Sequence, residues 1–295
     1  MNGRERGFLL LGSQLGDPDR KPLTAPQLRN LAQRAAAMEK PTWERELEDA
    51  DLLALGYGPE MADRIVGLLE DEDQLDWYLN RGKKSGCIPL TRVSGRYPAQ
   101  LRQALGLDSS AVLWAKGDLS ILEKPRIALV GSRDIRDENA AFAARVGAEA
   151  ALQGYVLVSG NARGADRIAQ TACLNAGGQV ISVVADELEK HQSTENVLYL
   201  SEDSFDTAFS AVRAHSRNRV IHALGEKTFV AQCNLGKGGT WSGTVQNLKE
   251  NWSPVFGFRD GSEAMKQLEQ LGAVLITEED LTDLSGLKGR NLSLF

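Results

Sequence analysis

Two stretches decide the fold: RIALVGSRDIRDENAAF, residues 126–142, and GYVLVSGNARGADRIAQTACLNA, residues 154–176. Each contains a short apolar run, Ile127–Val130 in the first and Val156–Val158 in the second. A glycine-containing loop ends each run, and a helical pattern follows it. Short apolar strands that alternate with helices are typical of βαβ units in a parallel sheet. The sequence therefore predicts an α/β fold.

The two loops predict a binding site for an anion. The first is Gly131-Ser132-Arg133, and the second is Ser159-Gly160-Asn161-Ala162-Arg163-Gly164. In a parallel sheet such loops meet at the carboxyl edge, where ligands bind. Backbone N–H groups near helix starts, with an arginine in each loop, suit phosphate, so nucleic acid or a nucleotide is the expected ligand. The alternative is a pair of tight strand–helix turns, in which Asp166 only favours the helix dipole.

Composition limits the kind of nucleic-acid binder. The 295 residues are 42% hydrophobic and 25% charged, which is ordinary for a globular protein, and the formal net charge is −6. A chain with this charge does not coat nucleic acid by charge alone, so the site must be a local basic patch.

Cysteine spacing and hydropathy predict a reduced, cytoplasmic protein with no membrane partner. Cys87, Cys173 and Cys233 are isolated and lack zinc-binding spacing, so we expect buried thiols and no metal or other cofactor. No early run is long enough to span a bilayer or to form a signal-peptide core.

The chain is expected to divide into a helical part, an α/β part and a tail. Residues 1–23 read as a loose arm, and residues 24–84 as a small helical domain that starts with a capping box at Thr24 and Gln27. Its helix–turn–helix centre is typical of SAM or helix-hairpin-helix modules, which bind either proteins or the DNA backbone. Residues 85–284 form the predicted α/β domain, with 85–123 as its leading segment, and 285–295 form the tail.

Two further segments add polar groups to the same edge. Arg217-Asn218-Arg219 lies at a break in a helix predicted over 205–224, and belongs either to a phosphate site or to a solvated charged face. Lys237-Gly238-Gly239-Thr240 precedes another helix, but it is not a P-loop because its lysine comes before the glycines. Trp241, the next residue, is either a core residue or a stacking platform for a base.

Catalytic groups are scarce in the sequence. His191, His215 and His222 belong to no recognisable nucleophile or metal motif, and no Ser/His/Asp arrangement can be assembled. We therefore expect a binding protein and not an enzyme.

The segments described so far, taken in order, resemble the DNA-processing protein A family, also called DprA or Smf. The likeness begins near Ser85 and rests on RYPAQL, VLWAKGDLSIL, IALVGSR, GYVLVSGNARGAD, NRVIHAL and the loop 237–244, with matching spacing. It implies an extended Rossmann-like domain, doubly wound around a mostly parallel sheet, preceded by a small all-helical domain.

The resemblance also implies a function and a set of residues. Members of the family bind single-stranded DNA with little sequence preference, protect it, and pass it to the RecA recombinase, notably during natural transformation. The implied DNA-facing residues are Gly131, Ser132, Arg133, Ser159, Gly160, Arg163, Arg217, Asn218, Arg219, Lys237, Gly239 and Thr240, and Asn161, Gly164 and Gly238 complete the predicted loops. A homodimer is a further possibility.

The chain departs from the family pattern in three places. Gln232 stands where an acidic residue is common, Phe256-Gly257-Phe258 replaces the usual Pro-Gly turn, and no winged-helix tail follows. These differences question a standard role in transformation more than they question the pocket.

Two alternative functions share this fold. A phosphoribohydrolase acting on nucleoside monophosphates would need a glutamate soon after a GGxGT stretch, whereas GGTWSGTVQN offers Gln246 and Asn247 there. A sensor of small nucleotide signals is the second alternative, and the acidic net charge favours it.

The last five residues suggest a partner. Asn291, Leu292, Leu294 and Phe295 resemble the short QLxLF-type peptide that docks on the replication sliding clamp. The alternative is a tail that folds onto its own domain.

Overall fold

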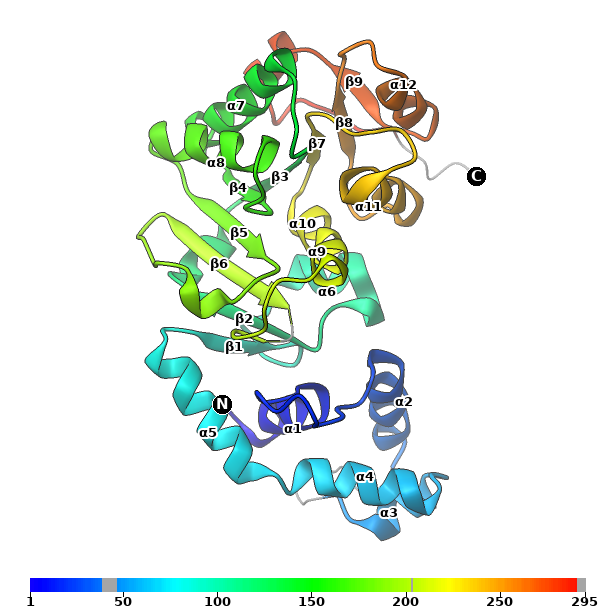
Figure 1. Ribbon diagram of the computed structural model, residues 1–295. Helices are drawn as coiled ribbons and strands as arrows, with labels where there is room; N and C mark the ends of the chain where they lie inside the picture. Colours follow the sequence, from blue (N-terminus) through cyan, green and yellow to red (C-terminus); the bar gives the residue numbers. More distant parts are fainter. Residues whose placement is uncertain (39–46, 203, 291–295) are drawn as a thin grey trace.

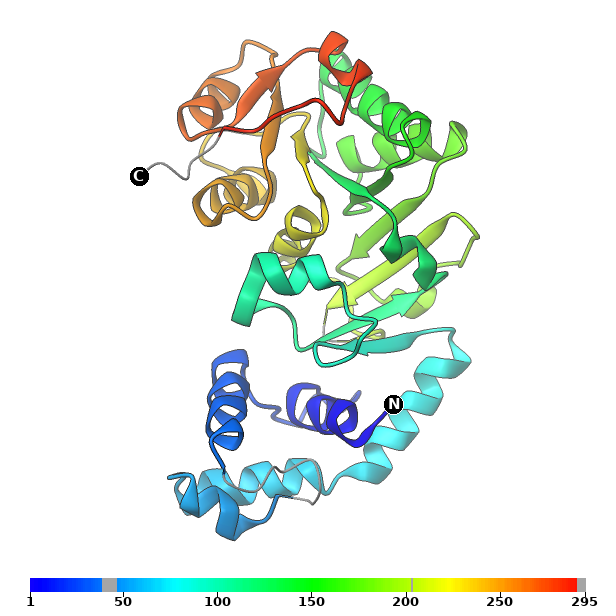
Figure 2. The same ribbon diagram turned by 180° about the vertical axis from the view of Figure 1, so that it is seen from behind.

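A computed structural model describes residues 1–38, 47–202 and 204–290 (Figures 1 and 2). In this part of the chain nine strands form a single sheet in the order β1-β2-β6-β5-β4-β3-β7-β8-β9. The strands are β1 (Ile88–Thr91), β2 (Val112–Lys116), β3 (Arg126–Val130), β4 (Val156–Ser159), β5 (Val180–Val184), β6 (Val197–Glu202), β7 (Thr228–Val230), β8 (Val255–Phe258) and β9 (Val274–Ile276). The strands from β6 to β9 pair in parallel, and only the β1–β2 and β2–β6 pairs are antiparallel. The predicted doubly wound, mostly parallel α/β fold is confirmed.

The direction of winding reverses at β3. From β3 the chain adds β4, β5 and β6 on one side, and it later adds β7, β8 and β9 on the other. In such folds the loops that follow the two strands at the reversal point leave toward opposite faces of the sheet, and ligands bind in the crevice there. The reversal point lies where the sequence placed the ligand loops.

Helices cover both faces of the sheet (Figure 1). One face packs against α7 (Asp137–Leu152) and α8 (Ala165–Asn175), whose apolar residues form one core with the strand residues that point to that face, such as Ile127, Leu129 and Leu157. The other face packs against α6 (Ala99–Leu105), α10 (Asn218–Leu224), α11 (Gly238–Glu250) and α12 (Glu263–Gln270). Short 3-10 turns span Gly106–Asp108, Leu119–Glu123, Leu188–Lys190 and Glu279–Thr282.

The N-terminal helices gather beyond the antiparallel edge of the sheet, next to β1 and β2 (Figure 2). They are α1 (Gly3–Gly12), α2 (Ala25–Ala36), α3 (Asp49–Ala54), α4 (Pro59–Leu69) and α5 (Glu72–Lys84), and we call them the helical module. The capping box predicted at Thr24 is present. Residues 39–46 of the predicted helical domain lie outside the described part of the chain.

The expectation of a loose arm over 1–23 is wrong. Helix α1 starts with a capping box between Asn2 and Glu5, and it buries Leu9, Leu10 and Leu11. Three adjacent leucines point in three directions around a helix, so their spacing carries no one-sided helical signal. They are buried because α1 lies between the rest of the helical module and the sheet.

The helix predicted over 205–224 is wrong in its first part. The structure has a loop up to Ser210, then α9 (Ala211–Ser216) and α10, with the break close to the predicted position. Phe205 is buried in an aromatic cluster instead of lying on a helix face. We call residues 204–210 the Phe209 loop.

The three cysteines are buried free thiols. Burial raises the pKa of Cys87 and Cys173 to about 11 and that of Cys233 to about 12. Among the described residues no helix has the length and apolarity that a membrane crossing requires.

Candidate nucleic-acid interface

An open hollow lies at the carboxyl edge of β3 and β4. Its volume is about 570 Å³, and it is lined by Arg133, Asp134, Ile135, Arg136 and Arg163. The GSR loop after β3 and the loop after β4 thus form one surface, as the strand order requires. The two loop arginines that the sequence singled out line the same hollow.

Close backbone contact holds the two loops together. The Ala165 N–H donates to the Ser132 carbonyl oxygen at 3.1 Å. Gly164 has a φ of +82°, and a Cβ there would lie 2.4 Å from the carbonyl oxygens of Ser132 and Arg133. Gly131 is equally confined, because a Cβ on it would lie 2.3 Å from the Cβ of Ala165. Glycine is therefore required on both sides of this contact.

The arginines of the hollow are exposed. Arg163 pairs with Asp134 at 2.8 Å, yet their side chains remain 76% and 91% exposed. Such a pair contributes little stability, and it leaves the guanidinium free to exchange partners. Arg133 is exposed as well, and its guanidinium lies 5.9 Å from the centre of the Phe209 ring.

Phe209 is a candidate site residue that the sequence analysis missed. Its side chain is 54% exposed, and Val212 nearby in the chain is 79% exposed. An exposed phenylalanine next to an arginine is the pairing on which unstacked bases and phosphates bind. The sequence analysis placed it within a helix over 205–224 and gave it no role, so only the structure revealed its exposure.

Arg217 has a different position from the arginines of the hollow. Only 7% of the Arg217 surface is exposed, and its Nη1 donates to the Val183 carbonyl oxygen at 2.7 Å. Its guanidinium occupies the space beside Gly160, where a Cβ would lie 1.7 Å from Nη1. Burial lowers the pKa of Arg217, and the nearby Asp166 carboxylate opposes that shift. Arg217 therefore supports the loop after β4 from beneath.

Asp166 is the buried counterpart of Arg217. Burial raises the pKa of this carboxyl group, while Arg217 and the Ala162 N–H, which donates to Oδ2 at 3.2 Å, oppose the shift. Ser159 is fully buried at the end of β4, and Asn161 adopts the left-handed conformation with a φ of 58°. These residues shape the loop, and Arg163 is the member that reaches solvent.

Arg219 points away from Arg217. Two positions along a helix are about 200° apart, so their side chains diverge. Arg219 Nη2 bonds Glu202 Oε1 at 2.8 Å, and Nη1 bonds the Asp108 carbonyl oxygen. Glu202 is 7% exposed and also accepts from Ser110 and Ser216. The Arg219 guanidinium is thus paired with a buried carboxylate.

The segment 237–240 contacts the GSR loop and the start of α10 from the β7 side. Asn218 Nδ2 donates to the Gly239 carbonyl oxygen at 3.1 Å, and Thr240 Oγ1 donates to the Gly131 carbonyl oxygen at 3.0 Å. Lys237 and Gly238 are exposed at the start of α11. Trp241 is partly buried and packs against the core, so it matches the first of its two interpretations.

Gln232, the departure from the acidic family pattern, has a structural use here. Its Oε1 accepts from the Arg136 N–H at 2.9 Å, and its Nε2 donates to the Asp134 carbonyl oxygen at 3.1 Å. An amide can accept and donate in this way, whereas a carboxylate at the same position has no donor. Gln232 therefore fastens the β3–α7 loop to the end of β7.

His222 lies in a neutral buried network away from the hollow. Its Nδ1 faces Thr228 Oγ1 at 3.4 Å and Asn247 Nδ2 at 3.2 Å, and Ser253 completes the network. Burial lowers the pKa of His222 to about 3. His191 contacts Asp186 at 2.9 Å. Across the described ranges, no group of three His, Cys, Asp or Glu side chains is placed to hold a metal ion.

The buried histidine predicts a pH-dependent stability. The unfolded chain takes up the His222 proton below its ordinary pKa of about 6.5, whereas the folded chain does so only near 3. Stability should therefore fall as the pH drops below 6.5, by about 2 kcal/mol at pH 5 from this residue alone. Urea unfolding of the protein and of His222→Gln, at pH 7.5 and pH 5, measures it. The variant should lose less between the two pH values, and equal losses would contradict the assignment.

Comparison with known proteins gives one family. A family model described as DNA recombination-mediator protein A matches residues 89–285. DNA processing protein DprA of Bacillus subtilis (strain 168) is 32% identical over 157 residues, which are 49% of this chain and 51% of that protein. DprA of Streptococcus pneumoniae (strain ATCC BAA-255 / R6) is 30% identical over 200 residues, 61% of this chain and 68% of that protein. The matched region thus spans about half the length of the Bacillus relative.

Solved structures agree on the fold. The X-ray structure of DprA from Streptococcus pneumoniae superposes with a TM-score of 0.75 at 22% identity, and the match covers 98% of this chain and 99% of that one. A structure describing the single-stranded DNA binding mode of DprA from Helicobacter pylori gives a TM-score of 0.56 at 23% identity, covering 66% and 94%. The helical module is included in the first of these matches, since nearly the whole chain is covered.

Proposed function

Because the chain belongs to the DNA recombination-mediator protein A family, we propose that it binds single-stranded DNA at the carboxyl edge of β3, β4 and β7 and assists recombination there. One exposed group of side chains carries the proposal: Arg133 and Arg163 line the same hollow, and Phe209 lies beside Arg133. Two guanidinium groups can follow a phosphate backbone, while the phenylalanine offers a face to an unstacked base.

The open shape of the hollow favours a DNA strand over a small nucleotide as its ligand. Its lining side chains are largely exposed, whereas pockets for small ligands enclose most of the ligand surface. An open, positively charged surface on a chain of net charge −6 suits a ligand that extends beyond the hollow in both directions.

Loss of Arg133 should weaken binding to all sequences alike. Arg133→Ala removes a phosphate contact and the cation next to Phe209, so we expect about a tenfold weaker binding of oligonucleotides. The slope of affinity against salt concentration should also become shallower. Electrophoretic shifts or fluorescence anisotropy with single- and double-stranded oligonucleotides, at two salt concentrations, measure both effects.

Lys249→Ala is the matched control. Lys249 is equally cationic and 80% exposed, but it lies in the last turn of α11. The first turn of that helix is the one that contacts the GSR loop. The Lys249 variant should bind as the unmodified protein does. Equal affinities of the Arg133 and Lys249 variants would remove the hollow from consideration.

The wider role follows from the family and stays part of the proposal. We infer that the protein acts without catalysis in the cytoplasm, hands single-stranded DNA to RecA, and so serves DNA uptake or recombination. Incubation with AMP should release no free adenine. The clamp-binding peptide lies at residues 291–295, outside the described part of the chain, and it remains a prediction, as does a homodimer.

A further inference from the structure

The Phe209 loop precedes α9, and only one of its ends lies near a residue that lines the hollow. Phe209 itself lies next to Arg133, while Phe205 at the other end is fully buried. Thr207, Ala208 and Phe209 are all exposed. An exposed segment of this kind has few contacts of its own, so its conformation depends on what holds its two ends.

Arg213 holds the end near the hollow. It lies in α9, and its guanidinium donates to backbone carbonyl oxygens of the loop. The acceptors of Nη1 are the carbonyl oxygens of Ala185 at 2.9 Å, Thr207 at 2.6 Å and Ala208 at 3.2 Å. Nη2 bonds Ser201 Oγ at 3.0 Å. These contacts tie the loop to the ends of β5 and β6, within the α/β domain.

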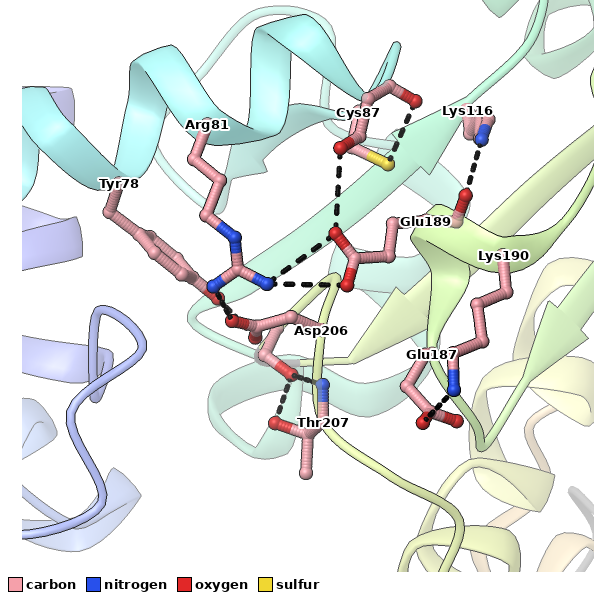
Figure 3. Close-up of polar contacts among 11 residues, drawn as sticks. Tyr78, Arg81, Cys87, Lys116, Glu187, Glu189, Lys190, Asp206 and Thr207 are labelled. Carbon is pink, nitrogen blue, oxygen red and sulfur yellow. Dashed lines mark hydrogen bonds and ion pairs between the residues drawn. The ribbon is translucent and has the colours of Figure 1, made fainter.

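Helix α5 of the helical module holds the other end (Figure 3). Asp206 Oδ2 accepts from Arg81 Nη1 at 2.7 Å, and Asp206 Oδ1 accepts from the Tyr78 hydroxyl at 2.7 Å. The Asp206 side chain is only 12% exposed. Both carboxylate oxygens of Asp206 thus accept hydrogen bonds from α5. Asp206 lies three positions before Phe209 in the chain.

The same two residues of α5 also hold Phe205. Its ring lies 4.6 Å from that of Tyr78 and 5.3 Å from the Arg81 guanidinium. Gly82 allows α5 to pack closely against the aromatic cluster, because a Cβ there would lie 2.8 Å from the Trp114 ring. Arg81 also reaches Glu189 at 3.2 Å, next to the Phe205 carbonyl oxygen, which accepts from the Glu189 N–H. The Arg81 side chain is 37% exposed, but the contact also includes the fully buried rings of Tyr78 and Phe205, so it is more than a pair of surface charges.

From this geometry we propose that the helical module positions the Phe209 loop, with Tyr78 and Arg81 as positioning residues that keep Phe209 beside Arg133. The inference rests on the proposed function, since it concerns the same nucleic-acid site. It extends that site to residues that lie before the family-matched region, which begins at residue 89. The module then contributes to DNA affinity without touching DNA.

Three variants test the proposal. Arg81→Met should weaken binding of a single-stranded oligonucleotide by about three- to tenfold, because DNA must then order the loop as it binds. Tyr78→Phe keeps the ring and removes one hydrogen bond, so its loss should be smaller. Arg6→Met is the control: Arg6 also pairs with acidic residues of α5, Glu72 and Asp76, but at the far end of the helix. It should bind like the unmodified protein.

A second measurement does not depend on DNA. Amide hydrogen exchange of residues 204–210 should be faster in Arg81→Met than in Arg6→Met, with exchange in β3 and β4 unchanged. Equal exchange in the two variants would overturn the positioning role, whether or not the protein binds DNA. If the loop loosens but no variant or unmodified protein binds the oligonucleotide, the proposed function fails and the structural link remains. If DNA binds equally well to all variants, the proposed function stands and the positioning role is refuted.

Discussion

Replacing Arg219 by methionine is expected to lower the free energy of unfolding by about 3 kcal/mol, because it leaves the buried Glu202 without its cation. Glu202 is 7% exposed and bonded to Arg219 at 2.8 Å. Methionine retains most of the packing of the arginine stem, so the loss reports the charge and its hydrogen bonds. Urea unfolding at pH 7.5 measures it from the shift of the midpoint at constant slope.

Arg163→Met is the matched control for this experiment. Arg163 also pairs with a carboxylate at 2.8 Å, but both side chains are mostly exposed. Its loss should change stability by less than about 0.5 kcal/mol and should weaken binding of single-stranded DNA. The two arginines looked alike as candidates for phosphate binding. If Arg219→Met is as stable as Arg163→Met, the distinction between a structural and a ligand-facing arginine is wrong.

Gly164→Ala is expected to cost about 2–4 kcal/mol and to abolish binding at the hollow, since it forces the two ligand loops apart. A methyl group at this position would lie 2.4 Å from two backbone oxygens of the GSR loop, which has little freedom to retreat. It also adds backbone strain, because a φ of +82° with a ψ of −131° is a conformation that residues with a Cβ rarely adopt.

Gly154→Ala measures the cost of a positive φ without a steric clash. Gly154 has a φ of +78°, close to the +82° of Gly164, but nothing lies within 4 Å of its added Cβ. It should lose only the conformational part, about 1 kcal/mol. Thermal unfolding and DNA binding of both variants give the comparison. Similar losses in the two would show that backbone strain, and not loop-to-loop contact, makes Gly164 necessary.

The extent of successful prediction differs between fold and site. Apolar strands such as Ile127–Val130 and their glycine loops are local signals, and their order along the chain determines which loops share an edge of a parallel sheet. The α/β architecture and the convergence of Arg133 and Arg163 therefore followed from the sequence. The capping box at Thr24 was equally local, and it was found where predicted.

Contacts between distant segments decided the rest. The letters around Phe209 do not show that the chain leaves the helix there, because Phe205 and Asp206 are held by α5, more than a hundred positions earlier. Likewise Leu9–Leu11 are all buried only because α1 lies between the sheet and the rest of the helical module.

The sequence by itself determined the class of fold, the edge that carries the ligand loops and the chemistry of those loops, because these depend on neighbours in the chain. Only the tertiary structure decided which polar side chains are free. Arg217 is enclosed beneath Gly160 and Arg219 is bound to Glu202, whereas Arg133 and Arg163 face solvent. The physical reason is that burial and pairing are properties of surfaces brought together by folding, and a run of letters such as Arg-Asn-Arg has the same charge in either setting.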